Sequence, residues 1–124
     1  MNYKNLLLAL ALGGLLTGSA AAQNPNASGA GPGVYDPGHP RVNQINRREQ
    51  VQQRRIANGV RSGQLTPREA TRLESRENHL VRNEKRDLVK DNGRLTRKDQ
   101  VKLNREANHV SRDIYRDKHN AAVR

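Results

Sequence analysis

Cysteine, phenylalanine and tryptophan are absent from this chain of 124 residues, and aromatic residues make up only 2% of it. Without cysteine the chain can form no disulfide, thiol nucleophile or thiolate metal site. Hydrophobic residues amount to 33%, close to the range in which a chain buries too little apolar surface to fold alone. We therefore expect one small domain with a thin core, for which a homodimer is one way to gain buried area.

The chain has one long apolar run, and it lies at the N-terminus. Lys4 precedes the apolar residues 6–16, and Ala20, Ala21 and Ala22 follow where a signal peptidase reads small side chains. A run of about 11 residues is too short to span a bilayer, which takes ~20. Residues 1–22 are predicted to be a signal peptide cleaved after Ala22, so the mature protein is expected to be periplasmic or secreted, without a transmembrane segment.

The next segment, residues 23–43, is rich in glycine and proline, which favour neither helix nor sheet. It is predicted to be a disordered linker, with Tyr35 and His39 in contact with solvent. At Gln44 the composition changes to charged helix formers. We therefore predict a helical repeat domain over residues 44–124.

A stretch of eight residues occurs twice in that domain, thirty residues apart: residues 62–69 read SGQLTPRE and residues 92–99 read NGRLTRKD. In each copy a glycine ends one helix, and a threonine with an acid three residues later begins the next as a capping box. The sequence therefore predicts two structural corners between helices. Their residues are Gly63, Leu65, Thr66, Glu69, Gly93, Leu95, Thr96 and Asp99.

Three helices are predicted around these corners, over residues 44–58, over 67–90 and from 97 onward. Short connections favour antiparallel neighbours, so the fold class is an all-α antiparallel three-helix unit. The central helix would be about 36 Å long and would place the two corners at opposite ends. The expected core residues are Ile45, Ile56, Ala70, Leu73, Leu80, Val81, Leu88, Leu103, Ala107, Val110, Ile114 and Ala121.

Two carboxylates, Glu77 and Glu84, share the apolar arc of the central helix. Three arrangements are open. The two carboxylates would form a pair with shifted pKa values, or each would pair with an Arg or His of a neighbouring helix, or the arc would be less buried at their positions. We expect the second or the third arrangement. Because no nucleophile–base spacing or phosphate-binding loop accompanies them, we expect no enzymatic activity, no catalytic residues and no cofactor.

The corners also resemble the second half of an EF-hand calcium loop, because Gly63 and Gly93 are each followed by Leu, Thr and a carboxylate. The first half of each loop lacks the acidic ligands that a calcium ion needs. A degenerate EF-hand-like module with weak or no calcium binding is the alternative interpretation. His79 and His109 hold equivalent repeat positions among Arg and Lys, which repel cations, so no metal site is expected.

The motifs Leu65-Thr66-x-x-Glu69 and Leu95-Thr96-x-x-Asp99 are similar to the Leu-Thr-x-x-Gln motif of the Spy/CpxP family of periplasmic chaperones and stress proteins. This resemblance implies an all-helical cradle that binds unfolded clients on a basic concave face without ATP. The chain differs from the family in having Glu and Asp where the family has Gln.

Positive charge is the remaining signal, with 23 Lys and Arg against 12 Asp and Glu and a formal net charge of +11. Cations recur at spacings of three and four on the central and third helices, which favours an outward basic stripe that binds an anionic surface or an acidic, unfolded client. Export and the scarcity of aromatic side chains argue against nucleic acid. The predicted partner-binding residues are Arg72, Arg76, Arg86, Lys98, Lys102, Arg105, Arg112 and Arg116.

Overall fold

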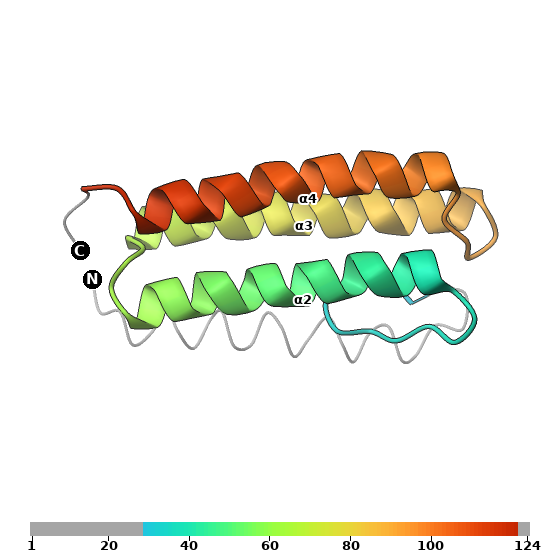
Figure 1. The fold of residues 1–124 in the computed structure, drawn as a ribbon, viewed down its shortest axis with the longest axis horizontal. Helices are drawn as coiled ribbons and strands as arrows, with labels where there is room; N and C mark the ends of the chain where they lie inside the picture. Colours follow the sequence, from blue (N-terminus) through green and yellow to red (C-terminus); the bar gives the residue numbers. More distant parts are fainter. Residues whose placement is uncertain (1–28, 122–124) are drawn as a thin grey trace.

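The protein is a bundle of three α-helices, and the computed structural model describes residues 29–121 of it. Helix α2 spans Pro40–Arg61, α3 spans Pro67–Lys90 and α4 spans Arg97–Lys118, with no strand in the described part of the chain. α3 runs antiparallel to α2 and α4, so the two corners lie at opposite ends (Figure 1). The predicted all-α antiparallel unit is thereby confirmed; the predicted signal peptide lies outside the described residues.

Each corner is held by the capping box that the repeat predicts. The Thr66 hydroxyl accepts from the Glu69 amide at 3.2 Å, and the Glu69 carboxylate accepts from the Thr66 amide at 2.9 Å. Thr96 and Asp99 form the same pair of bonds, both 3.1 Å long. Gly63 has a φ of 72°, a conformation that side chains disfavour, and its equivalent in the second copy has 83°. The duplicated motif is therefore a device for reversing the chain.

α2 is longer than the predicted helix over residues 44–58. It begins at Pro40, whose fixed φ suits the first helical position, and continues to Arg61. Gly59, which follows the predicted end of this helix at residue 58, lies buried inside the helix. A Cβ at this position would lie 2.7 Å from Cδ1 of Leu65, so the small residue lets the corner leucine pack against the helix.

The prediction of a disordered linker is corrected for residues 29–43. Residues 29–39, called the strap below, are ordered and fold back along α2, and residues 40–43 belong to the helix itself. Asn46 holds the strap: its Oδ1 accepts from the Gly31 amide at 2.8 Å, and its Nδ2 donates to the carbonyls of Gly29 and Val34. A glycine-rich segment is ordered here because a buried amide supplies its hydrogen bonds.

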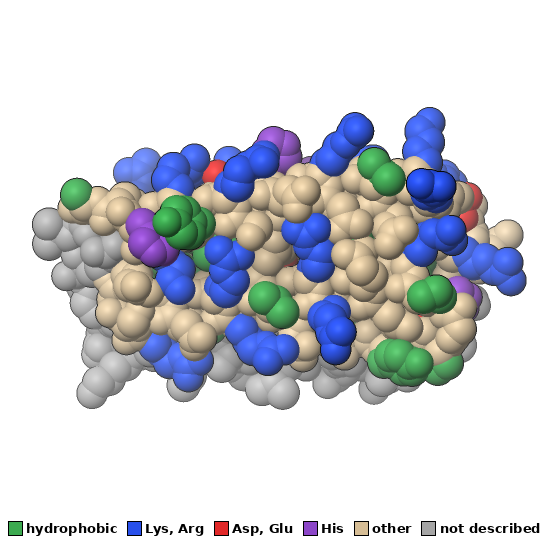
Figure 2. All heavy atoms as spheres, viewed as in Figure 1, with side chains coloured by type: hydrophobic (Ala, Val, Ile, Leu, Met, Phe, Trp, Pro, Cys, Tyr) green, Lys and Arg blue, Asp and Glu red, His purple; other side chains and the backbone are tan. Residues whose placement is uncertain are grey.

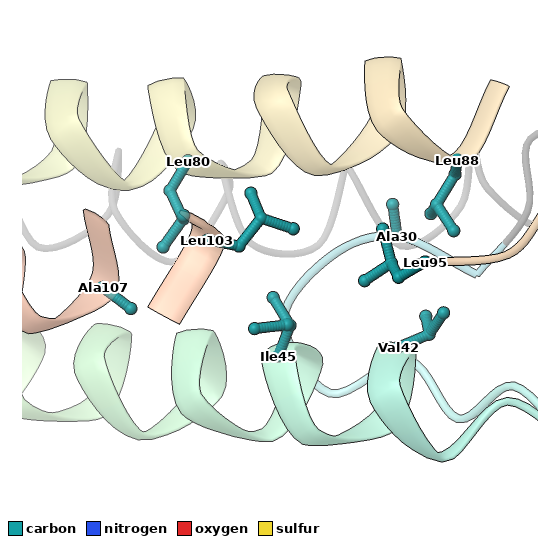
Figure 3. Packing of buried hydrophobic residues seen from close by; sticks show 8 residues of the cluster. All are labelled: Ala30, Val42, Ile45, Leu80, Leu88, Leu95, Leu103 and Ala107. Carbon is teal, nitrogen blue, oxygen red and sulfur yellow. The ribbon is translucent and has the colours of Figure 1, made fainter. Parts of the chain in front are cut away.

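The apolar core consists of two clusters at the two ends of the bundle. Figure 3 shows the first, in which side chains of α2, α3 and α4 meet a strap residue and the corner leucine of the second repeat. Its members are Ala30, Val42, Ile45, Leu80, Leu88, Leu95, Leu103 and Ala107. The second contains Ile56, Leu65, Leu73, Val110 and Ile114. These clusters contain all the predicted core residues except three.

Two predicted core positions differ from expectation. Ala70 is buried as predicted, although it belongs to neither cluster, whereas Val81 is only half-buried. Ala121, expected to extend the seam of the third helix, lies beyond the end of α4 and is exposed. None of the helices in residues 29–121 combines the length and hydrophobicity that a membrane span requires.

Candidate functional site

Acidic and basic residues are separated between the interior and the surface. All 12 Asp and Glu lie within residues 29–121, and none of them is an exposed residue; each is buried or half-buried. Most Lys and Arg are exposed. Seen from the side on which α4 lies in front of α3, Lys and Arg spread over the whole bundle, and acidic side chains show only near its margins (Figure 2). The surface is therefore cationic with little local neutralisation.

Several cations predicted to bind a partner are instead engaged at the α3–α4 interface. Arg72 forms an ion pair with Asp117, and Arg76 forms one with Asp113, each reaching from α3 to α4. The acids are buried, whereas the two arginine side chains remain about half exposed, at 50% and 49%. These arginines neutralise buried carboxylates, which is a structural role.

Three more of the predicted cations lie close to aspartates: Lys102, Arg86 and Arg116. Lys102 Nζ lies 2.6 Å from Asp87 Oδ2 across the same interface, and the Arg86 Nε lies 3.9 Å from the other oxygen of that carboxylate. Arg116 contacts Asp113 at 3.0 Å on its own helix. Five of the eight predicted binding cations therefore lie beside acids.

The other three predicted cations are Lys98, Arg105 and Arg112, and all three are exposed. Arg112 Nη2 donates a hydrogen bond to His109 Nδ1 at 2.7 Å. Lys98 and Arg105 make no hydrogen bond or ion pair with any residue that the structure describes. Only these three of the predicted set retain an uncompensated charge.

Sequence reasoning missed the arginines of α2. This helix carries six arginines and a single acid, Glu49, which is buried. Arg48 donates to Asn104 Oδ1 at 2.7 Å, and Arg55 donates to Ser111 Oγ at 2.6 Å, both on α4. Because these partners are neutral, the bonds orient the guanidinium groups without cancelling their charge. Counting charge helix by helix, and not searching for regular stripes, would have found them.

These arginines define a surface that we call the α2–α4 face. On α4 one side of the helix carries a row of exposed residues at spacings of four and three: Val101, Arg105, Asn108, Arg112 and Tyr115. Asn108 accepts a hydrogen bond from Arg48 at 2.6 Å. On α2 the exposed residues Arg47, Val51 and Arg54 follow the same spacings and lie beside Arg48 and Arg55. No acid lies on either row. The face consists of Arg47, Arg48, Val51, Arg54, Arg55, Val101, Arg105, Asn108, Arg112 and Tyr115.

Three glutamates lie in the interior without a partner. Glu49 of α2 and Glu77 and Glu84 of α3 are each 0% exposed, and their carboxyl oxygens accept no hydrogen bond from any residue in the range 29–121. The expectation that Glu77 and Glu84 would pair with an Arg or His, or would lie where the arc is less buried, is therefore wrong. Unpaired buried carboxylates are costly, because ionised groups lose their hydration without compensation.

The interior environment favours the protonated form of all three. Burial raises the pKa of Glu77 to about 8, helped by the neighbouring charge of Glu74. The pKa values of Glu49 and Glu84 are also raised, first by burial. For Glu49, repulsion from Glu84 and Glu77 adds to this, while Lys85 opposes it. With these three carboxyls neutral, the net charge would be three units more positive than the formal value.

The three helix pairs differ in how they are joined. α2 and α4 share side-chain hydrogen bonds, among them Gln44 to Asn104 at 3.0 Å and Gln52 to the Ala107 carbonyl at 2.6 Å. α3 and α4 share the ion pairs above and a bond from Asn83 to Glu106. Within the described residues, no hydrogen bond or ion pair joins α2 to α3. The unpartnered glutamates come from these two helices.

The corner carboxylates are engaged in capping. Glu69 and Asp99 each accept from the amide of the corner threonine, and Asp99 also lies 3.2 Å from Lys90 Nζ. In residues 29–121 no group of three or more His, Cys, Asp or Glu is arranged to hold a metal ion. The capping role accounts for the part of the motif that resembles an EF-hand.

Comparisons with protein-family models, with curated proteins and with solved structures found no match for this chain.

Proposed function

We propose that this protein is an exported helical module that captures anionic surfaces or clients through the charge of its α2–α4 face. The observation that carries the proposal is the absence of any exposed acid among the 12 acidic residues, together with a face whose arginines have only neutral partners. A cationic surface without interspersed acids attracts polyanions over distances of a Debye length. The function is binding, without catalysis.

The face also positions its charges. Arg48 and Arg55 are held by hydrogen bonds to α4, so they lose less conformational freedom on meeting an anion than free side chains would. Exposed apolar residues lie between the arginines: Val51 and Tyr115 are 46% and 61% exposed. Mixed arginine and apolar surface suits acidic stretches of unfolded proteins as well as anionic headgroups. The similarity to the Spy/CpxP motif supports the client alternative.

The test compares two triple variants with the same change in net charge. In the first, Arg47→Gln, Arg54→Gln and Arg105→Gln remove charge from the α2–α4 face. In the second, the matched control, Arg68→Gln, Arg82→Gln and Arg86→Gln remove three exposed cations of α3. Binding to dextran sulfate is measured by titration calorimetry at low and moderate salt.

We expect the face variant to lose about tenfold in affinity at low salt, because three exposed charges contribute ~0.5 kcal/mol each. The control should lose much less, and all affinities should fall steeply as salt rises. Equal losses in both variants would mean that net charge, and not this face, determines binding. If binding is confirmed, suppression of the aggregation of an unrelated unfolded protein tests the chaperone alternative.

A further inference from the structure

The interface between α2 and α3 is unusual in a protein with so many cations. The chain has 23 Lys and Arg for 12 acids, and at the α3–α4 interface these cations reach Asp87, Asp99, Asp113 and Asp117. None reaches Glu49, Glu77 or Glu84. We call these three residues and the contact between their helices the α2–α3 seam. Its lack of ion pairs among the described residues contrasts with the paired acids of the α3–α4 interface.

Among the described residues, the surroundings of the seam supply only partial compensation, from Lys85. On α3, Glu74 adds negative charge to Glu77, and Lys85 is the one cation that acts on Glu49 and Glu84. The strap contributes the Gly31 amide near Glu84, but this amide donates to Asn46. The strap's own charged pair, Asp36 with His39, is joined within the strap at 2.8 Å.

α4 contributes no counter-charge to the seam either. Its buried acids Asp99, Asp113 and Asp117 bind cations of α3, and the half-buried Glu106 accepts from Asn83. Its cation Lys102 is held by an acid of α3. Among the described residues no cation forms an ion pair with the seam carboxyls, so protonation is what neutralises them.

We propose that the α2–α3 seam is a proton-operated latch: the helices stay in contact while Glu49, Glu77 and Glu84 carry protons, and α2 separates from α3 when they lose them. Ionisation places three like charges at positions that are 0% exposed, and separation hydrates them. Since no hydrogen bond or ion pair of the described residues crosses the seam, separation breaks none. The bonds of α4 to both neighbours make α4 the hinge.

The test measures distances between helices in the full chain as the pH rises. The chain contains no cysteine, so spin labels attach only at introduced ones. One pair, Arg54→Cys with Arg82→Cys, spans α2 and α3; a second pair, Arg82→Cys with Arg105→Cys, spans α3 and α4. All three positions are exposed. Double electron–electron resonance then reports each distance at pH 5 and pH 9.

We expect the α2–α3 distance to lengthen by roughly 10 Å, about one helix diameter, while the α3–α4 distance stays constant. The variant Glu49→Gln, Glu77→Gln, Glu84→Gln should abolish the response, whereas Glu106→Gln, a control at the α3–α4 interface, should retain it. The latch is overturned if neither distance changes, if both lengthen together as in global unfolding, or if the triple variant still responds. None of these outcomes depends on polyanion binding.

Discussion

Replacing Glu77 by leucine should stabilise the protein, although the substitution removes a charged residue from a highly charged chain. Glu77 is 0% exposed, accepts no hydrogen bond and follows Leu73 by one helical turn. Its pKa rises from 4.5 to about 8 on folding. At pH 7 the unfolded chain holds this carboxylate ionised and the folded chain holds it protonated, a difference of ~2.5 pH units at ~1.4 kcal/mol each. The native glutamate therefore costs about 3 kcal/mol at neutral pH.

The sign of the pH dependence follows from the raised pKa. A carboxyl whose folded pKa exceeds the unfolded value contributes its full stability below about pH 4.5 and loses it as the pH rises towards 8. The native protein should thus become less stable between pH 5 and pH 8. Glu77→Leu should be more stable than the native protein by about 3 kcal/mol at pH 7, and the ionisation part of this gain should shrink to under ~1 kcal/mol at pH 5.

Urea denaturation followed by circular dichroism, at pH 5 and pH 7, measures both differences. Glu106→Leu is the matched control: Glu106 is half-buried and accepts from Asn83, so its loss should destabilise the protein. The reasoning is refuted if Glu77→Leu destabilises the protein at pH 7. It is refuted equally if the effect is the same at both pH values, since a hydrated or paired carboxylate would behave in that way.

Two further predictions concern the corners. Thr96→Ala removes the hydroxyl that accepts from the Asp99 amide and should cost about 1 kcal/mol in urea denaturation, while Lys98→Ala, an exposed neighbour, should cost much less. Asp99→Asn should destabilise the protein at pH 6 but not at pH 2. Burial raises the pKa of Asp99, but hydrogen bonds from Thr96 and Lys90 outweigh this and lower it to about 2. The contribution of Asp99 to stability is present above about pH 4 and is lost as the pH falls through 2. Equal melting temperatures of Asp99→Asn and the native protein at pH 6 would contradict this reasoning.

The α3 and α4 helices and their corners could be predicted because their signals are local. α3 begins at Pro67 and ends at Lys90, as predicted, since a threonine cap, a proline at the first helical position and a glycine-containing turn act within a few residues. The strap could not be predicted, because Asn46 holds it from more than one helical turn inside α2. Glycine and proline content predicts which conformations a segment favours by itself. It does not show whether a residue elsewhere in the chain, such as Asn46, supplies hydrogen bonds that order the segment.

The proposed binding face was only partly predictable for a similar reason. The spacing of cations placed them correctly on the outside of each helix, but it could not show which would meet an acid. Arg72 and Arg76 became structural because α4 presents Asp117 and Asp113 to them, whereas the arginines of α2 face amides and a hydroxyl. Helical periodicity predicts on which side of its own helix a side chain lies. Ion pairing depends on how two helices pack against each other, which periodicity does not contain.

Sequence alone thus determined an all-α chain that reverses direction twice, its central helix and a strongly positive charge. Tertiary structure decided which charges cancel and which remain, and within residues 29–121 it left Glu49, Glu77 and Glu84 without an ion pair or hydrogen bond. Helix capping and helical periodicity involve residues only a few positions apart, so they can be predicted from the sequence. Neutralisation and desolvation depend on atoms brought close from distant parts of the chain, and these exist only once the helices have packed.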